Sequence, residues 1–312
     1  MSVLALDTSN YTTSAAVFDG REGENVGRLL QVRPGELGLR QSDALFQHVK
    51  QLPQLMEQLA SQGRLENIQA VGASTRPRAV EGSYMPCFLA GVNAAAAFAL
   101  GKGIPLIHTT HQQGHIAAAL FATGERELFE QENLVFHVSG GTTDLLLCQG
   151  AERITPLGTS QDLYAGQAVD RLGVKLGYPF PAGVYVSEQA AQCTEKVHPK
   201  VSVKGVNCSL SGLENQYTKL LAEGKDPAYV CKYCLICVAE TLTRMARAAL
   251  EDHPGLPVVF AGGVMSSDLI RTYVSARVPG ARFVPGKFAS DNAIGVSILA
   301  AREQGAWQTT SM

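Results

Sequence analysis

The chain has 312 residues, of which 46% are hydrophobic and 17% are charged. These proportions exclude a disordered or fibrous chain and indicate a globular protein long enough for two domains. The formal net charge of -2 excludes nucleic-acid binding through overall charge alone, so an RNA partner would need a local basic patch or helper subunits.

The apolar segments and the cysteines predict a cytoplasmic protein without a membrane span. The longest apolar run, residues 90–100, is interrupted by Asn93 and is too short to cross a bilayer. Met1 leads directly into a strand-like segment rather than into a charged and apolar leader. The seven cysteines are odd in number and scattered, which is typical of a reducing compartment.

The first half of the chain is predicted to alternate strands and helices. Residues 3–20 form two apolar strands joined by a turn of small hydroxyl residues. A helix is expected over residues 42–62, where apolar residues recur at the helical period, and a strand over residues 68–74. A small-residue helix over residues 82–100 and a short strand over residues 104–107 then lead to a run of histidines.

The second half repeats this plan. Residues 134–150 again form a strand, a turn of small residues and a second strand, which favours a duplicated architecture. The further elements expected here are a strand over 154–158, a helix over 162–176, a loop over 179–183, a strand and turn over 206–213, a helix over 228–252 and a strand over 257–264. The sequence therefore predicts two α/β domains facing a central cleft, an N-terminal domain over residues 1–125 and a C-terminal domain over residues 126–312.

Glycine-containing turns follow apolar strands at residues 139–142, 181–183 and 261–264. Glycine lets the backbone approach a ligand closely and offer N–H groups to phosphate oxygens, although such turns also join ordinary hairpins. Together with the first hairpin, they indicate a nucleotide site of the actin, Hsp70 and sugar-kinase type (the ASKHA, duplicated RNase H-like fold). In such a site a carboxylate such as Asp7 or Asp170 positions a cation or a ribose.

His111 and His115 are the candidate metal ligands. Positions four apart share one face of a helix, so the two imidazoles could bind one cation. The alternative is a helix start whose histidines cap or pack. Asp291 is the candidate third ligand because it precedes a helical run beginning at Ala293, although it could instead be the N-cap of that helix.

Short motifs in a fixed order along nearly the whole chain carry a more specific resemblance. They are residues 6–9 (Leu-Asp-Thr-Ser), Arg40 with the helix toward Pro53, 111–115 (His-Gln-Gln-Gly-His), 138–141 (Val-Ser-Gly-Gly), 166–170 (Gly-Gln-Ala-Val-Asp), 209–213 (Ser-Leu-Ser-Gly-Leu), 261–264 (Ala-Gly-Gly-Val) and 290–293 (Ser-Asp-Asn-Ala). Through these motifs the chain resembles the Kae1/TsaD family of tRNA threonylcarbamoyladenosine synthases, formerly labelled O-sialoglycoprotein endopeptidases (glycoproteases).

The resemblance implies a set of site residues and a reaction. It places one divalent metal, iron or zinc, on His111, His115 and Asp291. It places an ATP- or AMP-type nucleotide, or threonylcarbamoyl-AMP, on Val138, Ser139, Gly140, Gly141, Asp170 and Gly183. The glycine-containing turns add Thr142, Gly262 and Gly263 to the expected nucleotide site. The implied activity is transfer of the threonylcarbamoyl group to the adenosine beside the anticodon of tRNA, with partner proteins of the same machinery and in a homo- or heterodimer.

Several positions depart from the family pattern and motivate a second hypothesis. Residues 142–144 (Thr-Thr-Asp) stand where the family has His-Thr-Gln, Gln167 replaces a glutamate, and Ser267 replaces an asparagine. The alternative is therefore a divergent paralogue that acts as a nucleotide-binding regulatory or assembly module without modifying tRNA.

Two other kinds of site are disfavoured. In zinc proteases with a His-Glu-x-x-His helix, the residue after the first histidine is the general base, and Gln112 cannot accept a proton. Peptidase activity is therefore not supported. Cys231, Cys234 and Cys237 share a broad helix face, but a metal cluster needs a fourth ligand, so core packing is expected for them.

Overall fold

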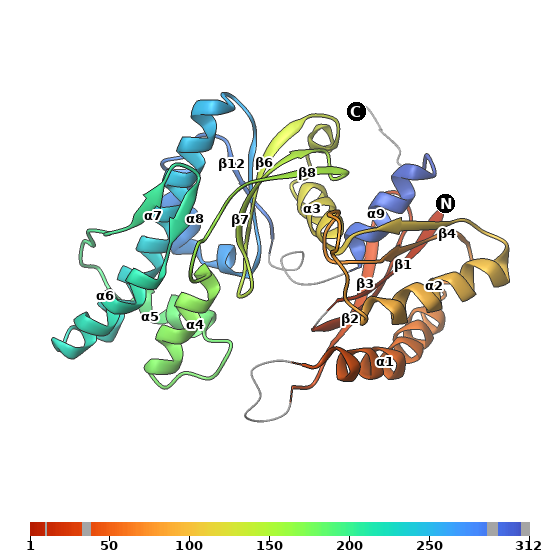
Figure 1. Cartoon of the computed structure of the whole chain (residues 1–312), viewed down its shortest axis with the longest axis horizontal. Helices are drawn as coiled ribbons and strands as arrows, with labels where there is room; N and C mark the ends of the chain where they lie inside the picture. The colour runs from red at the N-terminus through yellow and green to blue at the C-terminus, as the bar shows by residue number, and fades with distance from the viewer. Residues whose placement is uncertain (10, 33–38, 286–292, 307–312) are drawn as a thin grey trace. The chain divides into compact units, whose positions relative to one another are not determined.

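The computed structural model describes residues 1–9, 11–32, 39–285 and 293–306, and the chain divides into two compact units (Figure 1). The first unit comprises Met1–Phe129 together with Asp291–Met312, and the second comprises Glu130–Ser290. Each unit contains a five-stranded sheet with helices packed on it, so the predicted α/β class is confirmed.

The sheet of the first unit has the strand order β3-β2-β1-β4-β5. Its strands are β1 (Ser2–Thr8), β2 (Thr12–Phe18), β3 (Gly23–Leu29), β4 (Ile68–Ser74) and β5 (Leu106–Thr109). β2 runs antiparallel to β1 and to β3, whereas β4 runs parallel to β1 and β5 runs parallel to β4. The carboxyl ends of β1, β4 and β5 therefore lie at one edge of the sheet, where ligands of α/β proteins commonly bind.

Helices cover both faces of this first sheet. α1 (Gln41–Ser61) and α2 (Phe88–Lys102) bury apolar side chains in one layer with Val71 and Ala73 of β4. Successive residues of a strand point to opposite faces, so Gly72 faces the other side, where α9 (Ile294–Glu303) packs. A Cβ atom at Gly72 would lie 3.1 Å from side-chain atoms of α9, which explains why this close helix lies over a glycine. α3 (His111–Ala122) packs on α9, and η1 (Arg126–Phe129) packs on α3.

Glutamines of α1 cover the outer edge of β3. The Gln31 N–H donates to Oε1 of Gln47 at 2.8 Å, and Nε2 of Gln47 donates to the carbonyl oxygen of Gln31 at 3.0 Å. Nε2 of Gln51 also donates to the carbonyl oxygen of Leu29 at 3.4 Å. These amides satisfy backbone groups that an open edge would otherwise offer to another chain.

The sheet of the second unit has the strand order β12-β11-β6-β7-β8. Its strands are β6 (Glu132–Val138), β7 (Thr143–Gln149), β8 (Arg153–Thr159), β11 (Val258–Ala261) and β12 (Ala281–Phe283). β6, β7 and β8 form an antiparallel meander, whereas β11 runs parallel to β6. A separate hairpin consists of β9 (Ser202–Lys204) and β10 (Asn207–Ser209).

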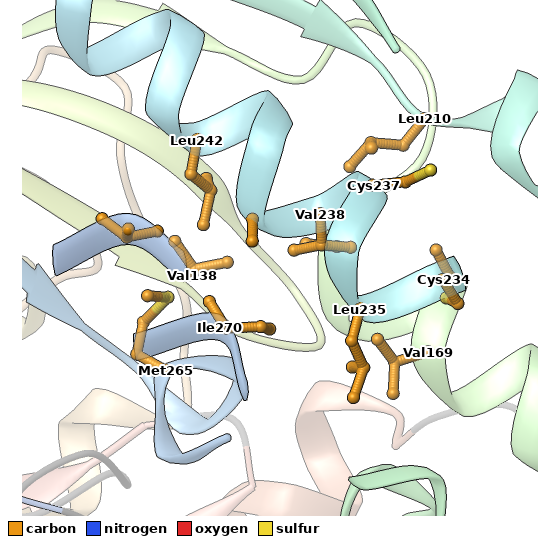
Figure 2. Packing of buried hydrophobic residues seen from close by; sticks show 14 of the residues in the cluster. Val138, Val169, Leu210, Cys234, Leu235, Cys237, Val238, Leu242, Met265 and Ile270 are labelled. Carbon is orange, nitrogen blue, oxygen red and sulfur yellow. The ribbon is translucent and has the colours of Figure 1, made fainter. Parts of the chain in front are cut away.

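The core of the second unit is built around the long helix α7 (Pro227–Asp252). The other helices of this unit are α4 (Ala165–Lys175), α5 (Gly183–Ala191), α6 (Ser211–Ala222), η2 (Gly263–Ser266) and α8 (Asp268–Ser275). Figure 2 shows Cys234 and Cys237 of α7 among apolar side chains, with Val138 and Ile270 in the same cluster. The rings of Phe136 and Phe260 stack in this core with centroids 4.7 Å apart.

Several elements differ from the sequence-based expectation. The two hairpins are confirmed as β1-β2 and β6-β7. The elements that were not expected include three helices, α5, α6 and α8, and three strands, β3, β9 and β12. α9 groups with the first unit, whereas the predicted division assigned residues 126–312 to one C-terminal domain. The physical reason is that α9 packs on β1, β2 and β4 of the first sheet. Within the described residues, no helix is both long and apolar enough to span a membrane.

Candidate functional site

A capping box fixes the start of α3 directly after β5. The Gln113 N–H donates to Oγ1 of Thr110 at 3.2 Å, and the Thr110 N–H donates to Oε1 of Gln113 at 2.9 Å. This reciprocal pairing satisfies N–H groups that the first turn of a helix leaves without partners. His111 is therefore the first residue of the helix, and His115 lies one turn later on the same face. The capping role falls to Thr110 and Gln113 rather than to the histidines, whereas the ring of His111 packs against that of Phe88 with centroids 6.1 Å apart.

The two predicted histidines are brought together. The Nε2 atoms of His111 and His115 lie 2.9 Å apart, and the ring centroids lie 4.3 Å apart at an interplanar angle of 78°. The other ring nitrogen of His111, Nδ1, lies 2.9 Å from Oδ2 of Asp7 near the end of β1. This arrangement orients the two Nε2 atoms toward one point on the surface of α3.

The crossing of α3 and α9 lies at the same place. A Cβ atom at Gly295 would overlap the backbone oxygen of Gly114 and would lie 2.8 Å from the Ala118 nitrogen. Gly114 stands between the two histidines in the sequence, so the start of α9 is held against the turn of α3 that carries them. Asp291 itself lies outside the described residues, two positions before Ala293.

The histidine pair fits a metal ion. Two nitrogens that each lie about 2.0–2.1 Å from a tetrahedral zinc ion are about 3.3 Å apart. The two Nε2 atoms are hydrogen-bonded at 2.9 Å, which is within a few tenths of an ångström of that span. Histidine ligands commonly donate their second ring N–H to a carboxylate, as His111 can to Asp7. The described part of the chain contains no group of three or more His, Cys, Asp or Glu side chains arranged to hold a metal, so a third protein ligand would have to come from elsewhere, such as Asp291.

A cavity of about 460 Å³ lies within the second unit. Its walls come from the turn after β6, from α4, from the start of α5 and from η2, with one residue of α7. The lining residues are Ser139, Gly140, Gly166, Val169, Asp170, Pro181, Gly183, Val184, Ser187, Glu188, Leu235, Gly263, Val264, Ser266 and Ser267. The volume is within the range of small-ligand sites.

The turn after β6 depends on close packing against α4. A Cβ atom at Gly166 would lie 2.6 Å from the Gly140 nitrogen and from the Ser139 oxygen, so α4 approaches this turn only because position 166 is glycine. The hydroxyl groups of Ser139 and Thr142 lie 2.9 Å apart and close the turn. The turn therefore presents Ser139 and Gly140 to the cavity while Thr142 holds its shape.

Asp170 is the carboxylate of the cavity wall. Its Oδ1 atom accepts a hydrogen bond from the Ala182 N–H at 2.7 Å. Burial raises the pKa of this carboxyl above its ordinary value, although the N–H groups of Ala182 and Gly183 act in the opposite direction. A carboxyl at a cavity wall with a perturbed pKa is typical of a binding or catalytic position.

The predicted nucleotide residues fall into two groups. Five of them line the cavity, namely Ser139, Gly140, Asp170, Gly183 and Gly263. The other four, Val138, Gly141, Thr142 and Gly262, do not line it. Gly262 has a φ of 102°, and a Cβ atom there would overlap the backbone oxygen of Val138, so this glycine allows η2 to lie against the end of β6.

The sequence reasoning missed several residues of the cavity wall. They include Ser187, Glu188, Leu235 and Ser266. Ser187 and Glu188 lie four and five positions after Gly183 on α5, a helix that was not expected. A prediction of α5 would have placed Ser187, four positions on, on the same face as Gly183.

The three cysteines of α7 belong to the core, as predicted. Each has a side chain no more than 1% exposed. Burial raises the pKa of the Cys231 thiol to about 12 and that of the Cys237 thiol to about 11, and it raises the pKa of the Cys234 thiol well above the ordinary value. These thiols are therefore poor candidates for metal binding, which requires the thiolate.

Comparison with known families identifies the chain. The family described as tRNA N6-adenosine threonylcarbamoyltransferase (TsaD) matches residues 35–297. The chain belongs to this family. A member from Streptococcus suis strain 05ZYH33 is 29% identical over 318 residues, which cover 96% of this chain and 92% of the relative. A member from Pelobacter propionicus is 30% identical over 295 residues, which cover 90% of this chain and 84% of the relative.

Solved structures with the same architecture confirm the predicted actin, Hsp70 and sugar-kinase fold. Full-length HypF in its phosphate- and nucleotide-bound form matches 98% of this TsaD-family chain and 47% of its own length, with a TM-score of 0.65 at 12% identity. Component A of the Acidaminococcus fermentans (R)-2-hydroxyglutaryl-CoA dehydratase matches 98% of this chain and 99% of its own, with a TM-score of 0.57 at 14% identity. These identities are low, so the structural likeness shows the fold alone.

Proposed function

We propose that this protein transfers the threonylcarbamoyl group of threonylcarbamoyl-AMP to the adenosine beside the anticodon of tRNA. Membership of the TsaD family supports the reaction class. The strongest structural support for the proposal is the 2.9 Å separation of the His111 and His115 Nε2 atoms at the carboxyl edge of the first sheet. A regulatory module without turnover has no need of two converging imidazoles, and the family membership does not favour that alternative.

The proposed metal centre consists of His111, His115 and Asp291. Imidazole nitrogens and a carboxylate suit iron or zinc. When bound, such an ion acts as a Lewis acid that polarises a carbonyl group. The residues of α3 supply two nitrogens whose positions are fixed by the capping box and by the helix crossing at Gly114.

The cavity of the second unit is proposed to hold the adenylate. Its lining offers the backbone of the Ser139-Gly140 turn and of Gly263 for phosphate oxygens, and the Asp170 carboxylate for hydroxyl groups of a ribose. The acyl donor is a mixed anhydride and is already activated, so the protein contributes mainly by positioning it. In the transfer, the adenosine amine forms a bond to the carbamoyl carbon, the bond from that carbon to the phosphate oxygen breaks, and the amine loses a proton as AMP leaves.

The proposal also assigns the surroundings of the reaction. The protein is proposed to act in the cytoplasm. It is also proposed to use partner proteins of the threonylcarbamoyladenosine machinery, because a net charge of -2 gives little general attraction to tRNA.

Two measurements test the proposal. Purified full-length protein is incubated with tRNA, threonylcarbamoyl-AMP, iron or zinc and the partner proteins, and the modified nucleoside is measured by mass spectrometry of digested tRNA. Modification is expected, and tRNA that stays unmodified would overturn the assignment.

The metal centre is tested separately by elemental analysis. His111→Ala and His115→Ala should each lose most of the bound metal. His108→Ala is the matched control, because this exposed histidine lies on β5 just before α3 and outside the pair. Equal metal content in the His111→Ala variant and the wild type would remove His111 from the centre.

A further inference from the structure

Asp7 is a buried carboxylate with two defined hydrogen-bond partners. The residue is 1% exposed, in a strand whose neighbours Leu6 and Thr8 are also buried. Oδ1 accepts a hydrogen bond from the Ser9 N–H at 3.0 Å, and Oδ2 lies 2.9 Å from Nδ1 of His111, which is 104 residues away in the chain. A buried carboxylate is costly unless it is hydrogen-bonded, so both contacts stabilise it in this place.

The contact with Asp7 bears on which nitrogen of His111 carries the proton. An ionised carboxylate only accepts hydrogen bonds, so the 2.9 Å contact with Asp7 Oδ2 favours a proton on Nδ1 of His111. In the neutral ring Nε2 then carries no proton and can accept a hydrogen bond or coordinate a cation, and this is the nitrogen that lies 2.9 Å from Nε2 of His115.

We propose that Asp7 is the positioning residue of the metal centre, which holds His111 in the Nδ1-protonated form with its Nε2 lone pair directed at the cation. The inference rests on the proposed function and adds a residue to it. Asp7 does not itself contact the ion. It acts through His111, by fixing the ring orientation and by increasing the basicity of the coordinating nitrogen.

A second buried imidazole near Asp7 does not compete for its charge. His48 of α1 is 0% exposed, and its Nδ1 atom lies 2.8 Å from Oγ1 of Thr13. Burial lowers the pKa of His48 to about 4, even though the charge of Asp7 acts in the opposite direction. His48 is therefore neutral at physiological pH and offers no positive charge to Asp7.

The test compares the zinc affinity of the full-length wild type with that of Asp7→Asn. Zn²⁺ alone is the probe, titrated in competition with a chromophoric chelator. The amide of asparagine can rotate and donate to Nδ1, which moves the ring proton to Nε2 and blocks the coordinating lone pair. The Kd for Zn²⁺ should rise about 10- to 100-fold, as expected for loss of an outer partner of a metal ligand.

Asp144→Asn is the matched control. Asp144 is a carboxylate of similar burial, 9% exposed, and its Oδ1 atom accepts a hydrogen bond from the Thr159 hydroxyl at 2.7 Å within the second unit. Its zinc affinity should equal that of the wild type. A loss of similar size in both variants would mean that removing a buried charge weakens binding nonspecifically, and it would overturn the assignment.

A spectroscopic measurement separates positioning from folding. In metal-free protein with ¹⁵N-labelled histidine, the imidazole nitrogens report which ring nitrogen is protonated. The wild type should show His111 with the proton on Nδ1, and Asp7→Asn should shift it toward Nε2. If Asp7→Asn does not fold, the wild-type spectrum alone decides, since a proton on Nε2 of His111 contradicts the proposal.

The outcomes distinguish this inference from the proposed function. Equal Kd values for Zn²⁺ in the wild type and Asp7→Asn would overturn the role of Asp7 and leave the transferase proposal intact. Weaker binding by Asp7→Asn together with unmodified tRNA would support the role of Asp7 and overturn the tRNA assignment. Wild type that binds no zinc would overturn the role of Asp7 and the zinc form of the metal centre.

Discussion

Gly295 of α9 lies directly against the backbone of Gly114 in α3. A Cβ atom at Gly295 would overlap the Gly114 oxygen, and a Cβ atom at Gly114 would lie 2.9 Å from a methyl carbon of Val296. The two helices can cross this closely only because both positions are glycine. Since Gly114 stands between His111 and His115, the same crossing brings the start of α9 to the histidine pair.

Gly295→Ala should therefore be strongly destabilising. The atoms in the way belong to the backbone of α3 and cannot turn aside, so we expect a loss of about 3 kcal/mol in the free energy of unfolding, the upper end of the usual overpacking effect. Denaturant titration followed by circular dichroism measures this loss. Zinc affinity should fall as well, because α9 would be displaced from the histidines.

Gly101→Ala is the control for the helical glycine. Gly101 lies in α2, and a Cβ atom there meets nothing within 4 Å. Alanine should raise the free energy of unfolding by about 0.5–1 kcal/mol, because glycine is the poorer helix former. Equal effects of Gly101→Ala and Gly295→Ala would contradict the close crossing.

His48 should make the protein less stable in mild acid. Its pKa is about 4 in the folded protein against an ordinary value of 6.5, so between these pH values the unfolded chain binds a proton that the native protein does not. The contribution of His48 to stability is complete above pH 6.5 and is lost progressively as the pH falls to about 4. The total loss should be about 3 kcal/mol, which denaturant midpoints measured from pH 7.5 to 4 would detect.

His48→Gln should flatten this acid dependence, whatever its effect on stability at neutral pH. His198→Gln, at an exposed histidine of the second unit, should keep the wild-type dependence. An unchanged slope in His48→Gln would assign the acid sensitivity to other groups.

Gln47→Ala should loosen the edge of the first sheet. It removes both hydrogen bonds to the backbone of Gln31, at 2.8 and 3.0 Å. The groups are partly solvated, so the free energy of unfolding should fall by only about 1 kcal/mol. Hydrogen exchange at the Gln31 amide should quicken. Gln58→Ala, on the exposed side of α1, should leave that exchange rate unchanged.

Alkylation should divide the cysteines by burial. At pH 8 the three thiols of α7 are protonated and buried, whereas Cys193 is partly exposed. Iodoacetamide should therefore label Cys193 well before Cys231, Cys234 or Cys237, and mass spectrometry of tryptic peptides would show the order. In denaturant all seven cysteines should react at similar rates. Early labelling of Cys234 in the native protein would be inconsistent with its place in the core.

Elements with a strong local period could be predicted from the sequence. α1 and α7 repeat apolar residues at the helical spacing, and the expected ranges agree with the observed helices to within a residue or two. β3 could not be predicted, because only Val26 of this edge strand is buried and no alternation of apolar residues is visible. α5 was not predicted, because a loop that contains proline and glycine precedes it and because its first turn begins at Gly183, a poor helix former.

The sequence by itself determined that His111 and His115 share a face, because four-residue spacing on a helix is a local property of the chain. It also identified the family, because the motifs occur in a fixed order. Only the tertiary structure decided that Asp7 lies against His111, that α9 belongs to the first unit, and that five of the predicted nucleotide residues line one cavity. The reason is physical. These relationships join residues far apart in the chain, and they arise from the pairing of parallel strands and the packing of helices over glycines. Such long-range contacts leave no periodic pattern in the sequence from which they could be predicted.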